Sequence, residues 1–168
     1  VWNEFKLVCD QLYERRKQYL EEQKIGIQQE TELKTVLVER AKLFEQYNSE
    51  KAIDWINTSK EVQALHEDWK NTSHKFRSKT EELSKQFWHS YKKFFHNKNQ
   101  FFNKLEGERK ANLKLKEALC EKAESLQYSE DYSAAAEELK RLQAEWKTIG
   151  PVPTKQKDSI WERFRKAM

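Results

Sequence analysis

The chain has 168 residues, of which 37% are apolar and 36% are charged, with only three glycines and two prolines. Strands joined by tight turns need more Gly, Pro and Asn-Gly pairs, so this composition excludes a mainly β fold and favours long helices. The 32 basic and 28 acidic residues nearly balance, so we expect a surface with many charges of both signs and not a strongly basic protein. No stretch approaches the roughly 20 apolar residues that span a bilayer, so no membrane partner is expected.

Apolar periodicity and helix-breaking residues divide the chain into five expected helices. A long helix is expected over about 1–46, with a short helix following at about 50–70. A second long helix is expected over about 79–127, and a second short helix at about 131–148. A last helix is expected to start near residue 156. The pattern predicts an alternation of long and short helices.

The joint between the last two helices reads "IGPVPT" at 149–154. Pro151 and Pro153 cannot lie inside a helix, and Gly150 is a natural residue to follow a helix C-terminus. Thr154 or Asp158 is expected to cap the helix that follows. This joint is therefore predicted to be a corner at which the chain folds back.

Several blocks of sequence recur, which indicates internal repeats. The segment "LKTVLVERAKLF" at 33–44 matches "LKEALCEKAESL" at 115–126, and Gly26 and Gly107 recur at nearly the same spacing. A Trp-ended helical face also occurs twice with identical internal steps, as Trp55, Val62, Leu65 and Trp69 and as Tyr132, Leu139, Leu142 and Trp146. A Trp-x-x-aromatic element occurs three times, as Trp2/Phe5, Trp88/Tyr91 and Trp161/Phe164.

These repeats predict an all-α fold built as an elongated array of three-helix bundles. A helix of about 50 residues is about 75 Å long, which exceeds the diameter of a compact domain of this size. We therefore expect adjacent units to share long continuous helices, as in spectrin-like arrays, with Gly26 and Gly107 inside those helices. Residues 1–30 are then the last helix of a preceding repeat, 31–109 a complete repeat, and 110–168 a second, truncated repeat.

The repeated motifs resemble those of a bacterial family of tandem helical repeats. The matching residues are "LCE" at 119–121, "WKTIGPVP" at 146–153 and "WERF" at 161–164. The family is the domain of unknown function 349 family, common in the Bacteroidetes, and the resemblance implies a repeat protein of the bacterial cytoplasm. It supplies no catalytic residues. The segment "WKNTSHKF" at 69–76 departs from the pattern because it lacks Gly-Pro-x-Pro, so its corner must turn differently or its helix must run further.

No motif of catalysis, cofactor binding or metal binding stands out. Three isolated glycines cannot form a phosphate-binding loop. His89 and His96 lie two helical turns apart, roughly 10.5 Å, which is too far to share a metal without another helix. Cys9 and Cys120 lie in amphipathic patterns and are expected to be small buried residues in a reducing compartment. Most tryptophans have helical spacing, so core packing is favoured over base stacking.

One segment, residues 85–116, holds nine Lys and Arg against Glu106 and Glu108. Its aromatic residues fall on one face of a helical wheel and its basic residues on the other. Such a basic stripe suits a phosphate backbone, and the residues expected to contact it are Lys85, Lys92, Lys110 and Lys114. The competing interpretation is that the acidic segment at 45–68 neutralises these lysines within the bundle, since a charge run is usually a solvated face.

The favoured function is a non-enzymatic helical scaffold or protein-interaction module without cofactor or metal. The alternative is binding of DNA or ribosomal RNA through the basic stripe. An enzyme is a third and weaker hypothesis, because nothing singles out an acid/base pair. Protein is the first expected partner and nucleic acid the second, in the cytoplasm.

Overall fold

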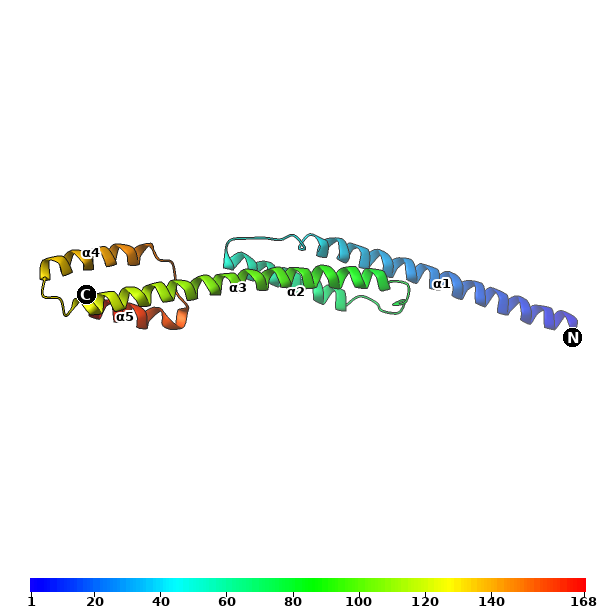
Figure 1. The fold of residues 1–168 in the computed structure, drawn as a ribbon. Coiled ribbons are helices and arrows are strands. Elements are labelled where there is room, and N and C mark those ends of the chain that lie inside the picture. The colour runs from blue at the N-terminus through cyan, green and yellow to red at the C-terminus, as the bar shows by residue number, and fades with distance from the viewer. The chain divides into compact units, whose positions relative to one another are not determined.

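The computed structural model describes all 168 residues and contains only helices (Figure 1). The elements are α1 (Trp2–Lys42), α2 (Ala52–Lys70), α3 (Glu81–Leu126), α4 (Tyr132–Thr148), the short 3-10 helix η1 (Thr154–Gln156) and α5 (Lys157–Ala167). The prediction of an all-α fold is confirmed. None of these helices is both long and apolar enough to cross a membrane.

The chain divides into two compact units, residues 1–98 and residues 99–168, and α3 contributes residues to both. Gly107 lies within α3, as the sequence predicted, so one glycine does not interrupt this 46-residue helix. The energetic reason is that glycine costs only about 1 kcal/mol relative to alanine inside a helix.

In the first unit, the second half of α1, α2 and the first half of α3 lie side by side (Figure 1). Trp69 of α2 is 4% exposed and Phe87 of α3 is fully buried, and their rings stack with centroids 4.2 Å apart. Trp55, at the start of α2, is 1% exposed and packs beside Phe94 of α3. Leu37, Val38, Ala41 and Leu65 complete the apolar core around Trp69 and Phe87.

In the second unit, α4 and α5 lie beside the second half of α3 (Figure 1). Trp146 of α4 stacks on Phe164 of α5, again with centroids 4.2 Å apart. Arg163 donates two hydrogen bonds to the Glu124 carboxylate, at 2.7 and 2.8 Å, and these bonds hold the pKa of Glu124 below its usual value. The buried core residues are Leu119, Cys120, Ala123, Leu142, Val152, Ile160, Phe164 and Ala167.

The two stacks show which residues correspond between the units. Trp69 on Phe87 has an interplanar angle of 12°, and Trp146 on Phe164 has one of 14°. A lysine completes each stack, because Lys34 lies 5.6 Å from the Trp69 ring and Lys116 lies 4.7 Å from the Trp146 ring. Burial of the Lys116 ammonium lowers its pKa.

This correspondence corrects one sequence alignment. Phe87, and not Tyr91, occupies the position of Phe164, so Trp88 is not the counterpart of Trp161. The aromatic repetition in α3 misled the alignment because Phe87, Trp88, Tyr91, Phe94 and Phe95 offer several matches at helical spacing. The offset from Phe5 to Phe87 then equals the offset between the two Leu-Lys blocks that begin at Leu33 and Leu115.

The corner of the second unit contains the Gly-Pro-x-Pro segment. Helix α4 ends at Thr148, and the Asn112 side-chain amide donates to the Pro151 carbonyl at 2.9 Å. Gly150 follows the C-cap Ile149 of α4, as expected, although its φ is not positive. A Cβ at this position would lie 2.8 Å from Asn112 Nδ2, so the glycine leaves room for that amide.

The expected side-chain cap of the last helix is not found. Helix α5 begins after Gln156 with no side-chain cap, so neither Thr154 nor Asp158 has that role. The side chain that does cap a helix is Asp131, whose carboxylate accepts the N–H groups of Ser133 and Ala134 at the start of α4.

The corner of the first unit is secured by buried charge. Glu30 and Lys34 of α1 are 4% and 0% exposed and form an ion pair of 2.7 Å. Lys34 also donates to the Thr80 hydroxyl at 3.0 Å, and the Phe76 N–H donates to Glu30 at 3.1 Å. This cluster connects α1 to both ends of the 76–80 segment. The corner therefore turns without proline, and α2 does not run further but ends at Lys70.

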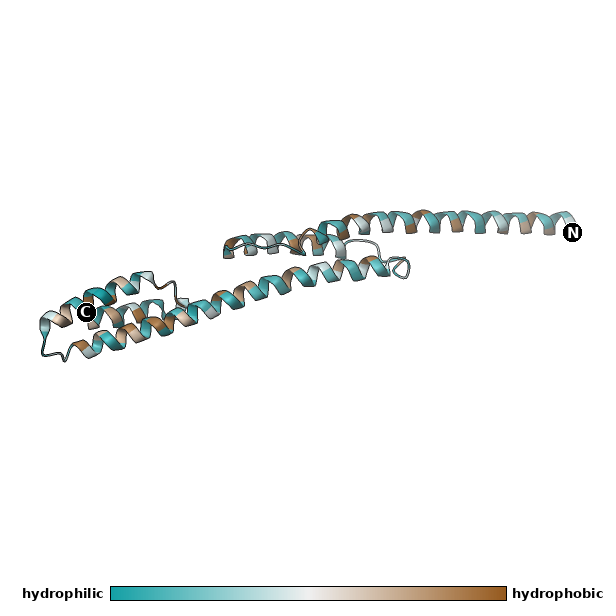
Figure 2. Cartoon of the chain, turned by 45° about the horizontal axis from the view of Figure 1, so that its top comes forward, coloured by the Kyte–Doolittle hydropathy of each residue, from teal (hydrophilic) through white to brown (hydrophobic).

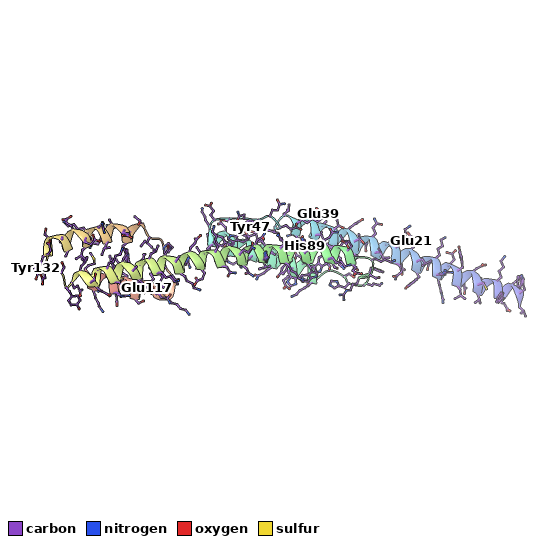
Figure 3. All side chains as sticks on the ribbon, in the orientation of Figure 1. Glu21, Glu39, Tyr47, His89, Glu117 and Tyr132 are labelled. Carbon is purple, nitrogen blue, oxygen red and sulfur yellow. The ribbon has the colours of Figure 1, made fainter.

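The first half of α1 is exposed on all sides (Figure 3). Apolar side chains nevertheless recur along it, as brown bands show among the teal (Figure 2). Trp2 is 73% exposed, and Cys9 is exposed, so the expected burial of these two residues is wrong for this chain. Trp161 is half exposed as well, although it contacts Trp146.

Candidate functional site

The four predicted phosphate-binding lysines are all exposed, and all four lie on α3. Lys85 and Lys92 belong to the first unit, whereas Lys110 and Lys114 belong to the second. Lys85 pairs with Glu81 at 3.1 Å, and Lys110 pairs with Glu106 at 3.6 Å, both along α3 itself. Lys92 and Lys114 form no ion pair.

The acidic segment 45–68 does not neutralise these lysines by direct pairing. Asp68 pairs with Arg40 of α1, at 3.4 Å. Glu45 accepts a hydrogen bond from the Ser90 hydroxyl, and Asp54 accepts one from Ser49. No ion pair joins α2 to α3, so the predicted charge complementarity between these two helices is not seen.

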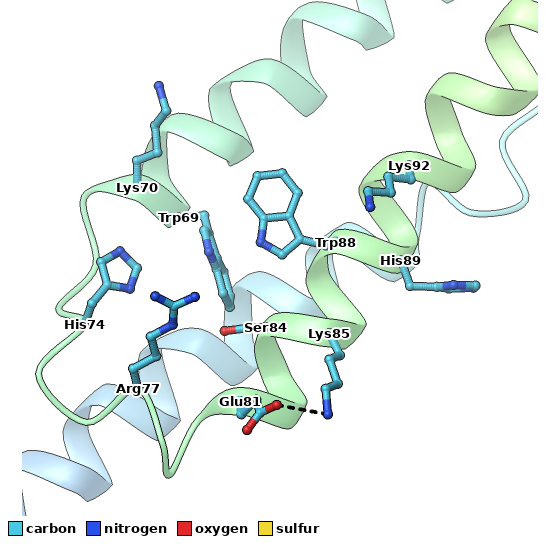
Figure 4. A pocket seen from close by; sticks show the side chains of 10 residues that line it. All are labelled: Trp69, Lys70, His74, Arg77, Glu81, Ser84, Lys85, Trp88, His89 and Lys92. Carbon is cyan, nitrogen blue, oxygen red and sulfur yellow. Dashed lines mark ion pairs between the residues drawn. The ribbon is translucent and has the colours of Figure 1, made fainter.

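A basic groove lies at one end of the first unit, where α2, the following corner and α3 meet (Figure 4). It is open to solvent and has a volume of about 780 Å³. Its lining residues are Trp69, Lys70, His74, Arg77, Glu81, Ser84, Lys85, Trp88, His89 and Lys92. We call this set the basic groove.

Positive charge dominates the basic groove because it has four Lys or Arg residues and one carboxylate, Glu81. Glu81 is paired with Lys85, and this contact raises the pKa of Lys85. Lys70 pairs with Glu67 outside the groove, at 2.9 Å. Arg77 and Lys92 have no acidic partner, so they are the two cations of the groove that remain available to an anion.

The floor of the basic groove is aromatic. Trp69 and Trp88 face its interior, with His74 and Arg77 approaching from the corner (Figure 4). Both sides of the Trp69 ring have neighbours, since Phe87 stacks on it and Lys34 lies near its centroid. Trp88 is only partly buried, and its neighbours His66, Phe87 and Tyr91 meet it at interplanar angles of 67°, 84° and 81°.

Sequence reasoning found only one wall of this groove. Lys85, His89 and Lys92 are spaced along one helix, so their common face could be read from periodicity. Lys70, His74 and Arg77 were missed, because they face α3 only after the 71–80 corner has folded. The sequence signal that could have found them is the basic composition of "KNTSHKFRSK" at 70–79.

A family model described as Domain of Unknown Function (DUF349) matches residues 1–76 and again residues 82–155. The chain belongs to the DUF349 family. Each DUF349 match starts near the beginning of a long helix and ends in the corner after a short helix. The basic groove therefore forms where the end of the first match meets the start of the second. Searches among curated proteins and solved structures found no match.

Proposed function

We propose that this DUF349 chain is a non-enzymatic scaffold made of three-helix-bundle repeats that share long helices. The observation that carries the proposal is the pattern of α1. At the offset that relates the two Leu-Lys blocks, Phe5, Leu12, Tyr13, Tyr19 and Leu20 correspond to Phe87, Phe94, Phe95, Phe101 and Phe102 of α3. Phe87 and Phe94 are fully buried in the first unit, whereas Phe5 and Leu12 are both 59% exposed.

This correspondence indicates what packs on the exposed face of α1. The matching residues of α3 pack against the second half of a long helix and a short helix. The first half of α1 should therefore receive two helices of the same kind from another DUF349 repeat. On this proposal, residues 1–30, 31–109 and 110–168 are parts of successive repeats, and the scaffold acts in the cytoplasm by binding proteins through the array.

A fusion tests this proposal directly. A second copy of residues 27–80 is placed before residue 1, so that its two helices and corner lead into α1. Hydrogen exchange of residues 2–20 should slow in the fused chain relative to the original chain. Leu12→Glu should abolish that protection, because a buried charge without a partner is strongly unfavourable. Leu7→Glu is the matched control, since Leu7 corresponds to the exposed His89.

Unchanged exchange of residues 2–20 in the fused chain would refute the proposal that two helices of another repeat pack on α1. Equal loss of protection in Leu7→Glu and Leu12→Glu would refute the assigned face.

The second candidate function is binding of DNA or ribosomal RNA backbone. The observation that favours it is that Lys85, Lys92, Lys110 and Lys114 are exposed, with Lys92 and Lys114 unpaired. Binding through phosphates weakens with salt, by about 0.9 log units per log unit of salt for each phosphate neutralised on duplex DNA. Replacement of all four lysines by Glu should abolish binding without unfolding. A gel shift at low salt that detects no complex with the original chain would reject this function.

A further inference from the structure

We infer that the basic groove of the first unit is a site for single-stranded nucleic acid, with phosphates at Arg77 and Lys92 and one base on the Trp88 indole. This inference rests on the second candidate function and gives it a location and a ligand form. It differs from the basic stripe, because it includes the corner residues and excludes Lys110 and Lys114.

The charges of the groove come from two walls. Arg77 stands on the corner after α2, and Lys92 stands on α3. Neither side chain has an ion pair or a hydrogen bond to another residue, so neither must break a contact to bind phosphate. Lys70 and Lys85 add charge at the rim, although each already has one carboxylate neighbour. Cations on both walls suit a chain of phosphates that runs along the groove.

The second feature that suits a nucleic acid is the aromatic floor of the groove. Phe87 already stacks on Trp69, so Trp69 acts as a core residue. Trp88 has no stacked neighbour, and Figure 4 looks onto the flat face of its indole between Trp69 and Lys92. A partly exposed indole between cations is the arrangement on which an unpaired base stacks.

The combination favours a single strand over a duplex or an acidic peptide. In a duplex the bases are stacked on one another, so the indole would have no partner. An acidic peptide would pair with Arg77 and Lys92 but would gain nothing specific from the Trp88 face. Only a ligand with both phosphates and accessible bases uses every feature of the groove.

The test measures fluorescence anisotropy of labelled 12-nucleotide oligo-dT and oligo-U with the full chain at low salt. A 12-base-pair duplex and poly-glutamate are the comparison ligands. We expect both single strands to bind more tightly than the duplex, and poly-glutamate to bind weakly. The log–log salt dependence should have a slope of about −0.7 for each phosphate neutralised on a single strand.

Charge variants locate the site. Arg77→Glu combined with Lys92→Glu should weaken single-strand binding at least tenfold and should leave the fold intact, because both side chains are exposed and unpaired. The matched control is Lys147→Glu combined with Lys157→Glu, which has the same change of charge on exposed side chains of the second unit that do not line the groove, and it should retain binding within about threefold. Lys110→Glu combined with Lys114→Glu changes the basic stripe outside the groove and should weaken binding less than the Arg77/Lys92 variant does. Circular dichroism verifies the helix content of these variants.

Aromatic variants test stacking. Trp88→Leu keeps an apolar side chain against Phe87 and removes the stacking surface, so the affinity should fall by about tenfold. Trp88→Phe retains an aromatic face and should bind within about threefold of the original chain. Equal affinity of the Leu and Phe variants would reject the role of Trp88.

The results of these tests distinguish failure of this site from failure of nucleic-acid binding as a whole. Failure of every nucleic acid to bind rejects both. Binding that is lost in the Lys110/Lys114 variant and kept in the Arg77/Lys92 variant leaves nucleic-acid binding in place and overturns this site. Equal binding of duplex and single strand, or tighter binding of poly-glutamate, also overturns it.

Discussion

At the scale of single residues, the two corners that follow the short helices are held to the long helices by different side-chain contacts. Glu30 and Asn112 stand at corresponding places in α1 and α3, and both hold the corner that follows a short helix. Asn112 does so with a neutral amide. Glu30 is a buried carboxylate that needs Lys34 as counter-charge. Burial alone would raise the pKa of Glu30, but the hydrogen bonds from Lys34 and the Phe76 N–H outweigh it and lower that pKa.

Glu30→Gln should reduce the free energy of unfolding by about 3–5 kcal/mol at neutral pH, because it leaves the Lys34 ammonium buried without a counter-charge. The folded-state pKa lies below the ordinary value of 4.5, so the ionised form stabilises the fold fully above that value. This contribution is lost as the pH falls through the folded-state pKa. The difference between the two proteins, measured by urea unfolding, should therefore shrink between about pH 7 and about pH 3.

Asn112→Ala is the control for this pH dependence, because it removes a neutral hydrogen bond from the equivalent corner. Its effect should be nearly the same at both pH values. A constant difference between Glu30→Gln and the original chain over this pH range would show that the charge of Glu30 does not stabilise the corner.

At the scale of helices, the two interior glycines differ, although their sequence positions look equivalent. A Cβ on Gly26 would lie 2.6 Å from the Phe76 ring, so this glycine lets the first corner lie against α1. A Cβ on Gly107 would meet nothing within 4 Å, because this part of α3 faces open space. Glycine at 107 therefore costs helix stability without a packing reason in this structure.

Gly107→Ala should stabilise the chain by about 0.5–1 kcal/mol, because alanine loses less backbone entropy in a helix. Gly26→Ala is the matched comparison and should destabilise it, since the Phe76 ring must move. Thermal unfolding followed by circular dichroism measures both. A lower melting temperature for Gly107→Ala would mean that α3 needs flexibility or a close contact at this point.

The helices themselves were predictable because their signals are local. Apolar periodicity and the shortage of Gly and Pro located all five α-helices. The predictions that failed concern contacts between residues that are far apart in the sequence. The Glu30–Lys34–Thr80 cluster looked like an ordinary surface pair, and the register of Phe87 against Phe164 depended on which ring Trp69 contacts. The corner wall of the basic groove was missed for the same reason.

At the scale of the whole chain, the two units have a helix in common but no core residue in common. The first apolar cluster runs from Leu37 to Trp88, and the second runs from Leu113 to Ala167. Between them, α3 presents exposed residues such as Lys104 and Gly107. Because the two apolar clusters share no residue, damage to one core should remain local.

Trp146→Ala tests this locality. Loss of the stack on Phe164 and of the contact with Lys116 should destabilise the second unit by about 3–5 kcal/mol. Hydrogen exchange followed by mass spectrometry should then show faster exchange in residues 113–167 and nearly unchanged exchange in residues 34–98. Trp69→Ala, the matching change in the first unit, should give the reverse pattern. If either substitution accelerates exchange throughout the chain, α3 couples the two cores strongly enough to make the chain one cooperative unit.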